Sequence, residues 1–178
     1  NYVELRSELA ECHGVRFSTS SDTEVLLAAY EVWGDECVKR FNGMWAFVIF
    51  DFINDRVFCS RDRFGVKPFL FAVDGKTLYV ASEAKAILAA NDRFRKPNYK
   101  AISLLLRASV GGQNLDTCFE GISRLPPAHN LVVENGKIRS ERYWDFPCLT
   151  QDSAIPSFED ASDQLRTLLS DAVRVRMR

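Results

Sequence analysis

The sequence lacks an excess of charge of either sign. Its 178 residues carry 23 Lys and Arg against 24 Asp and Glu, a formal net charge of -1, and the two signs are mixed along the chain. No field of one sign would therefore steer the protein toward nucleic acid or an anionic membrane surface. We expect neither of these as a partner.

A long apolar run is also missing. The longest one, Met44 to Phe50, falls far short of the roughly 20 residues that a membrane-spanning helix needs, and no signal-peptide pattern opens the chain. Because nothing in the sequence directs the chain to a membrane or out of the cell, we expect a cytoplasmic protein.

Cysteine is scarce and scattered. The five cysteines stand singly, without a C-x-x-C spacing, as Cys12, Cys37, Cys59, Cys118 and Cys148. An odd number without paired spacing predicts neither a disulfide framework nor a zinc site. We therefore expect reduced thiols and no bound metal.

Tight turns between apolar segments are what the sequence does contain. Asp74-Gly75 and Asn135-Gly136 are strong β-hairpin signals, and Asn54-Asp55 is a weaker one. Neighbouring strands should therefore be antiparallel. The segments Met44 to Phe50 and 69–73 are apolar at every position, whereas a half-solvated antiparallel strand would alternate. Both faces of these strands are therefore expected to be covered.

Helical segments are available to supply that cover. We expect them at residues 22–33, 82–90 and 98–108. One face of a strand can then lie against a second sheet and the other against helices. The sequence predicts an α+β fold, a four-layer helix, sheet, sheet, helix sandwich with antiparallel sheets. A plain two-sheet sandwich is the alternative, but it would leave these helices without a role.

Helical patterns also stand at both ends of the chain. One begins at Tyr2, without a lead-in, and closes at Gly14, a typical C′ glycine. The other begins at Ser157, which forms a capping-box pattern with Asp160, and runs out at Arg178 without a stop signal. Its apolar stripe needs a partner surface. We therefore expect the chain to be truncated at both ends.

The helix expected from Asp22 is the first candidate for binding chemistry. Ser21 and Glu24 have the spacing of a capping box, which would place Asp22 in the first turn, at the positive end of the helix dipole. That position alone explains an acid; the functional alternative is that Asp22 binds a ligand ammonium. The residues behind it are apolar nearly all round as far as Gly34, so we expect a buried, rigid helix.

The segment SRDRFGVKPFLF, residues 60–71, is the second candidate. Arg61 and Asp62 leave a strand, Gly65 allows a tight turn, Lys67 follows, and Pro68 fixes the entry to the next strand. A guanidinium fork can bond turn carbonyls as well as a carboxylate. A structural role is favoured, and an anion or domain-interface contact is the alternative.

Seven blocks stand in the order found in glutamine-hydrolysing asparagine synthetases. They cover nearly the whole chain and are NY, SDTEVLLAAYEVWG, FNGMWAFVIFD, SRDRFGVKPF, LYVASEAKAIL, FEGISRLPPAHNLVV and RYWD. The chain resembles the amidohydrolase half of that family, a class II glutamine amidotransferase domain of the N-terminal-nucleophile fold. The resemblance implies a partial amidotransferase domain over 1–144 with its N-terminal strands missing, a linker over 145–156, and the first helix of the ATP-dependent synthetase domain over 157–178.

The resemblance also implies a reaction in two sites. An N-terminal cysteine, with its own α-amine as base, attacks the glutamine side-chain amide and releases ammonia. In the second site ATP, with magnesium, activates aspartate, which the ammonia converts to asparagine. The cysteine is expected upstream of Asn1 and the S-G-G-x-D-S phosphate loop beyond Arg178. The chain by itself therefore holds no catalytic residue and is expected to be inactive.

Two sets of residues can be carried over from the family. Asp22 matches the acid that holds the glutamine α-ammonium, and Ser21 lies beside it. A diagnostic block, expected to brace a turn under or beside the contact with the synthetase half, comprises Arg61, Asp62, Gly65, Lys67 and Pro68. One departure is Ala128, which stands where the family often has glycine, so this turn is expected to differ in shape.

Two classes of function stay open. In the first, the intact protein is an ATP-dependent amidoligase that uses glutamine, with asparagine synthetase favoured over relatives that act on another carboxylate. In the second, it is a noncatalytic glutamine-binding or structural domain. Glutamine and the synthetase domain of the same chain are the expected partners, with a homodimer left open.

Overall fold

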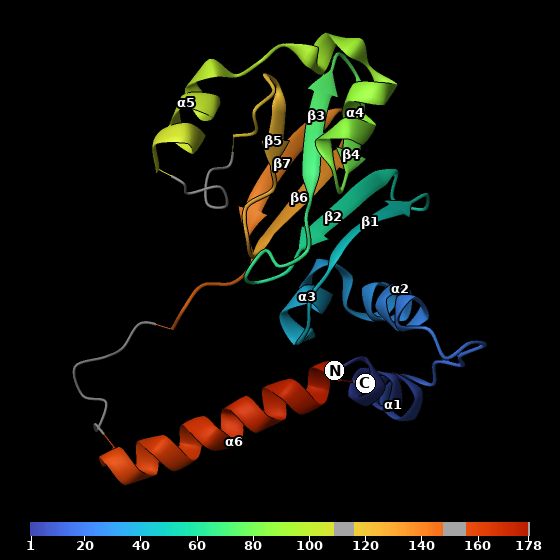
Figure 1. Cartoon of the computed structure of the whole chain (residues 1–178). Coiled ribbons are helices and arrows are strands. Elements are labelled where there is room, and N and C mark those ends of the chain that lie inside the picture. The colour runs from blue at the N-terminus through green and yellow to red at the C-terminus, as the bar shows by residue number, and fades with distance from the viewer. Residues whose placement is uncertain (109–115, 148–155, 178) are drawn as a thin grey trace. The chain divides into compact units, whose positions relative to one another are not determined.

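The computed structural model describes residues 1–108, 116–147 and 156–177 (Figure 1). These fall into two compact units, residues 1–43 with 145–178, and residues 44–144. Each unit is described by itself. Most of the expected linker at 145–156 lies outside the described residues, as does Cys148.

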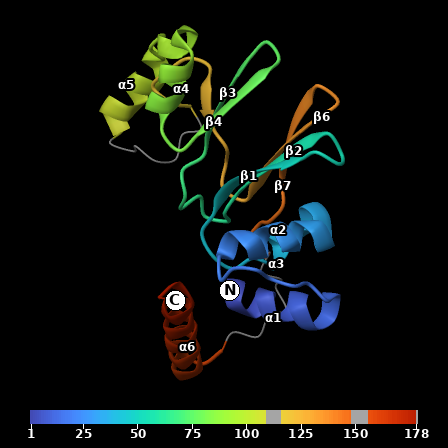
Figure 2. The ribbon, with the colours of Figure 1, turned by 90° about the vertical axis from the view of Figure 1, so that its right-hand side faces the viewer.

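The N-terminal segment is helical. It contains α1 (Tyr2–His13), α2 (Asp22–Trp33), the short 3₁₀ helix η1 (Gly34–Glu36) and α3 (Cys37–Arg40). The first two helices lie against each other (Figures 1 and 2), and Leu9 and Ala29 are fully buried. Helix α1 ends as the sequence predicts, because Gly14 adopts φ 68° and donates its N–H to the Leu9 carbonyl.

Helix α2 has the predicted bounds but is buried on one face only. Val25, Ala28 and Ala29 are buried, whereas Leu27 is 51% exposed. The expectation of a helix buried all round is therefore wrong. The helical elements that contact α2, namely α1, η1 and α3, cover one of its faces and leave the other open.

Helix α6 (Phe158–Arg176) begins where the capping pattern predicts. The Ser157 hydroxyl oxygen accepts from the Asp160 N–H at 3.1 Å. None of the residues of this helix is buried, and five of its large apolar side chains are more than half exposed: Phe158, Leu165, Leu168, Leu169 and Val173. In the part of the chain that the structure describes, no helix has the length and apolar character needed to cross a membrane.

The second unit contains two antiparallel sheets (Figures 1 and 2). The four-stranded sheet has the order β1 (Ala46–Asp51), β2 (Arg56–Arg61), β6 (His129–Glu134) and β7 (Lys137–Arg142). The three-stranded sheet has the order β4 (Thr77–Ala81), β3 (Leu70–Asp74) and β5 (Ile122–Arg124). Every pair of neighbouring strands is antiparallel, which confirms the prediction.

The three expected hairpins are present. Residues 52–55 join β1 to β2, a two-residue loop that opens with Gly75 joins β3 to β4, and Asn135-Gly136 joins β6 to β7. Asn135 and Gly136 have φ values of 51° and 69°, the geometry of the tight turn whose twist suits a hairpin. These turns fix the register of each strand pair.

The core of this unit lies between the two sheets. It contains Cys59, Phe69, Leu125 and Leu131, with side chains from both sheets packed around them. Helices α4 (Ala84–Ala90) and η2 (Asp92–Arg95) cover the other face of the three-stranded sheet, around Leu70, Ala72, Ile87, Phe94 and Ile122. A further helix, α5, spans Tyr99–Ala108. The helix, sheet, sheet order agrees with the predicted layering.

The coverage of individual strands is less complete than the sequence predicts. In β1, Ile49 is buried but Phe50 is 64% exposed, and in β3, Val73 is 43% exposed. The expectation that both faces of these strands are fully covered is wrong. Phe50 and Val73 are the second-last residues of β1 and β3, next to the hairpins that end these strands.

Candidate functional site

Ser21 and Asp22 lie at the start of α2. Ser21 is extended, with φ -71° and ψ 141°, and its hydroxyl oxygen accepts from the Thr23 N–H at 3.1 Å. This is the geometry of an N-cap. Asp22 is the first residue of the helix and is exposed, so its carboxylate stands at the positive end of the helix dipole.

Glu24 does not complete the predicted capping box. Its carboxylate accepts from the backbone N–H groups of Ser18 and Thr19, at 2.7 and 2.8 Å, and from the Thr19 hydroxyl. The pKa of Glu24 is lowered, mainly by the hydrogen bond from the Ser18 N–H. The loop before the helix offers this acid two amides, whereas a capping box would offer one, so Glu24 fixes the loop that leads into Asp22.

The Asp22 carboxylate has little to bind within the protein. Among the described residues, its one hydrogen bond is accepted from the Thr23 hydroxyl at 3.5 Å, the limit for such a bond. No Lys or Arg of the described chain pairs with it. The chain thus presents a carboxylate on a fixed backbone, which is what a ligand ammonium requires.

The second candidate, the turn that follows β2, is built around buried Asp62. This side chain is 1% exposed, and its two oxygens accept from the backbone N–H groups of Phe64, Val66 and Lys67, at 3.2, 2.9 and 2.9 Å. Its own carbonyl accepts from Gly65 and Ala128. Asp62 thus holds the whole turn through backbone groups.

Arg61 bonds to carbonyls of the same region. Its guanidinium donates to the carbonyls of Lys67 and Gly65, both at 2.8 Å, and to that of Leu125. Burial lowers the pKa of Arg61, and the nearby charge of Asp62 acts in the opposite direction. The side chain thus joins the turn after β2 to the segment that follows β5.

Two residues of this region have left-handed backbones. Gly65 has φ 63°, and a Cβ atom there would lie 2.9 Å from Cγ of Pro127 and 3.0 Å from Cζ of Arg61. Ala128 has φ 58°, the region that glycine favours. Its N–H donates to the Asp62 carbonyl and its own carbonyl accepts from Tyr143. Ala128 therefore takes part in the same turn in spite of its side chain.

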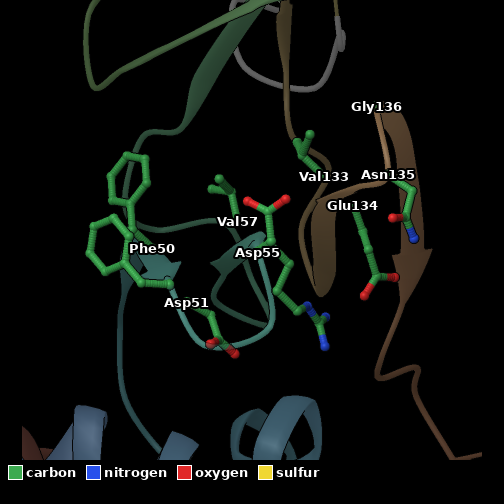
Figure 3. Close-up of a pocket in the computed structure, with 10 residues that line it drawn as sticks. Phe50, Asp51, Asp55, Val57, Val133, Glu134, Asn135 and Gly136 are labelled. Carbon is green, nitrogen blue, oxygen red and sulfur yellow. The ribbon is translucent and has the colours of Figure 1, made fainter.

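A pocket of about 320 Å³ lies at the tips of two hairpins (Figure 3). Residues of the β1–β2 hairpin, among them Phe50 and Asp55, lie on one side, and Glu134 and Asn135 of the β6–β7 hairpin lie on the other (Figure 3). None of the candidate site residues predicted from the sequence, at positions 21, 22, 61, 62, 65, 67 and 68, lines this pocket. The exposed tip residues Phe52 and Ile53 are 91% and 95% accessible.

The predicted turn residues and the predicted glutamine-binding residues belong to different units of the chain. Arg61, Asp62, Gly65 and Lys67 share one hydrogen-bonded turn, while Ser21 and Asp22 belong to the other unit. No group of three or more His, Cys, Asp or Glu among the described residues is placed to hold a metal ion. The hairpin-tip pocket and the buried polar pair of Ser60 and Asn130 were not predicted, because both depend on which strands lie side by side.

Comparison with known proteins gives a consistent result. Residues 1–144 match the family model of the glutamine amidotransferase domain. A protein of Methanocaldococcus jannaschii named as a candidate glutamine-hydrolysing asparagine synthetase is 36% identical over 100% of this chain. Asparagine synthetase 3 of Bacillus subtilis, also glutamine-hydrolysing, is 35% identical over 97% of it. This chain spans only 34% and 28% of their lengths.

A solved structure supports the fold. The glutamine phosphoribosylpyrophosphate amidotransferase of B. subtilis aligns with 81% of this chain and 27% of its own, with a TM-score of 0.54 and 22% identity. At this identity the likeness concerns the fold alone. It agrees with two antiparallel sheets combined with helices.

Proposed function

The chain belongs to the glutamine amidotransferase domain family, and from that premise we propose that it is the glutamine-hydrolysing part of a larger ATP-dependent amidoligase, with asparagine synthetase the favoured class. The observation that carries this proposal is the match to two glutamine-hydrolysing asparagine synthetases over 100% and 97% of the chain. In this proposal, the domain converts glutamine to glutamate and ammonia, and the ammonia amidates aspartate elsewhere in the protein.

In this function Asp22 binds the α-ammonium of glutamine. Its exposed carboxylate and its position at the first residue of α2 support the role, because a bound ammonium would supply the strong charge-assisted bond that the protein does not. Ser21 caps the helix and so fixes the backbone that carries this carboxylate.

The nucleophile of the reaction is proposed to lie outside this chain. Burial raises the pKa of both Cys37 and Cys59 to about 12, so both are thiols at neutral pH, whereas thiolate is the attacking form. An N-terminal cysteine would instead be activated by its own amine. We therefore propose that residues 1–178 alone do not hydrolyse glutamine.

ATP and magnesium belong, in this proposal, to the synthetase part of a longer protein. The sequence of this chain contains neither the S-G-G-x-D-S pattern nor the G-x-x-x-x-G-K-[ST] pattern, which are two forms of phosphate-binding loop. The residues present therefore do not fit the nucleotide, and its chemistry is assigned to the other domain. The turn at Arg61 and Asp62 is proposed to be structural, since the side chains of these two residues form hydrogen bonds to backbone groups of the turn.

The glutaminase reaction of the intact protein tests the role of Asp22. For Asp22→Asn we expect the KM for glutamine to rise about 10- to 100-fold with kcat nearly unchanged, because the lost bond holds the substrate equally before and during reaction. Glutamate release can be followed at several glutamine concentrations. Asp55→Asn, an exposed hairpin carboxylate, is the matched control and should leave both parameters unchanged.

The outcomes separate the functional classes. Glutamine-dependent formation of asparagine with release of AMP supports the synthetase. Glutamine binding by the intact protein without any glutamate release would instead favour the noncatalytic class. An unchanged KM in Asp22→Asn, with an active enzyme, would return Asp22 to a purely helical role.

A further inference from the structure

Asn130 is a buried amide with an unsatisfied oxygen. It lies in β6, is 2% exposed, and no donor of the described protein reaches its Oδ1 atom. Buried polar atoms nearly always have a hydrogen-bond partner, because an isolated one costs free energy on folding. The oxygen of Asn130 therefore calls for a donor.

Ser60 lies directly opposite Asn130 on the neighbouring strand. The two residues are paired in the register of β2 and β6, and Ser60 is fully buried. Its hydroxyl oxygen accepts from the indole Nε1–H of Trp45 at 3.0 Å. Among the described residues this is the bond that its side chain makes, so its own proton stays available. A buried donor and a buried acceptor thus face the same side of the sheet without bonding to each other.

Two aromatic residues flank this pair. Trp45 and Tyr143 stack with centroids 6.2 Å apart and an angle of 26° between their planes. The Tyr143 hydroxyl donates to the Arg61 carbonyl at 2.9 Å, and the Trp45 carbonyl accepts from the Asp62 N–H at 3.0 Å. Both rings are therefore held in place by the turn that follows β2.

We propose that Ser60 and Asn130 together bind one buried water molecule. The water donates to Asn130 Oδ1 and accepts from the Ser60 hydroxyl, which in turn accepts from Trp45. Side chains at directly opposed positions have Cβ atoms about 4.5 to 5.5 Å apart, a separation that a single water can bridge. The site belongs to the four-stranded sheet and does not depend on the proposed glutaminase function.

The chemistry of the pair selects water over an ion. A cation would meet one amide oxygen and one hydroxyl oxygen, neither of them charged, whereas Ca²⁺ and Mg²⁺ take about six or more oxygen ligands. An anion would face the unpaired oxygen of Asn130, which is an acceptor. A molecule that both donates and accepts satisfies the two residues at once.

A double-variant cycle on the full chain tests the proposal through its melting temperature. If a water is shared, Ser60→Ala and Asn130→Leu should each lower the Tm by about 2 to 4 °C. Each change removes one hydrogen-bond partner of the water and so leaves the other residue of the pair without its bond. The double variant should lose clearly less than the sum. Ser123→Ala, a half-buried serine in β5, is the control and should change the Tm by less than about 1 °C.

The opposite result would overturn it. Without the water, Asn130→Leu removes a lone buried oxygen, so the Tm should rise and the two changes should add. A crystal structure of the full chain decides the case even where leucine disturbs packing. A density peak within about 2.7 to 3.2 Å of both Ser60 Oγ and Asn130 Oδ1 supports the site, and its absence around well-ordered side chains refutes it.

Discussion

Asp62 and Asp22 carry the same carboxylate in two regions of the chain, and their surroundings differ in every respect. In the turn after β2, Asp62 is 1% exposed and accepts three backbone N–H groups. At the start of α2, Asp22 is exposed and accepts only one long bond from a neighbouring hydroxyl. The fold uses the hydrogen-bonding capacity of the Asp62 carboxylate, whereas the described protein uses little of that of the Asp22 carboxylate.

Two of the cysteines, Cys59 and Cys12, show the same contrast. Cys59 lies in the core between the sheets, fully buried, whereas Cys12 of α1 is exposed. Sequence alone gives each of them as a single, unpaired cysteine. The comparison teaches that the role of a polar residue depends on how completely the protein satisfies or encloses it.

The sharpest test of the comparison is to remove each carboxylate in turn. Asp62→Ala leaves three backbone amides of the turn without the acceptor that they share, so we expect a loss of about 3 to 5 kcal/mol in the free energy of unfolding. Asp22→Ala should cost only about 0.5 kcal/mol, through its interaction with the helix dipole. Urea unfolding of both variants, followed by circular dichroism, measures the difference. Equal losses would end the distinction between the two aspartates.

A second test concerns the glycine inside the Asp62 turn. Gly65→Ala forces a side chain into the left-handed region and against Pro127 and Arg61, so we expect a loss of about 2 to 4 kcal/mol. The matched control is Gly75→Ala in the β3–β4 hairpin. Gly75 has a similar φ of 59° but open space around it, so only the backbone strain of about 1 to 2 kcal/mol should appear. Similar losses at both positions would show that the turn is not tightly packed.

A third test concerns the buried thiol of Cys59. Burial raises the pKa of Cys59 from 9.0 to about 12, so the unfolded chain loses this proton at a lower pH than the folded protein does. Its contribution to stability is therefore complete below about pH 9 and is lost as the pH rises toward 12. Between about pH 8 and pH 10 this thiol should account for a fall of about 1 kcal/mol.

Variants at the two cysteines isolate that contribution. Cys59→Ala should flatten the alkaline slope of the unfolding free energy, and Cys12→Ala, at an exposed position, is the matched control. Urea unfolding at a series of pH values provides the measurement. An equal slope in wild type and Cys59→Ala would contradict the assignment.

Much of the fold could be predicted because its signals are local. Gly14 and Ser21 bound their helices through bonds within one turn, and Asn135-Gly136 sets a hairpin through its own backbone angles. Antiparallel pairing then follows from the short connections. The family could be predicted as well, since seven ordered blocks carry it.

What could not be predicted depends on partners distant in the sequence. The exposure of Phe50 and Leu27 reflects which layer reaches them, and an apolar residue gives no sign of that. The Glu24 carboxylate accepts from the backbone N–H groups of Ser18 and Thr19, whereas the sequence pattern predicted a bond to the N–H of Ser21. Amides on both sides were within reach, and the sequence does not show which of them the side chain takes. The roles of Ser21 and Asp22 toward glutamine stay predictions.

The hydrogen bonds of Arg61 and Asp62 to backbone groups affect how the protein responds to ionic strength. Surface ion pairs weaken as salt rises, since mobile ions screen charges that water already surrounds. These two side chains bond to peptide dipoles at short range, and Asp62 is shielded from solvent. We therefore expect rising salt to weaken the connection between the sheets less than it weakens a surface ion pair.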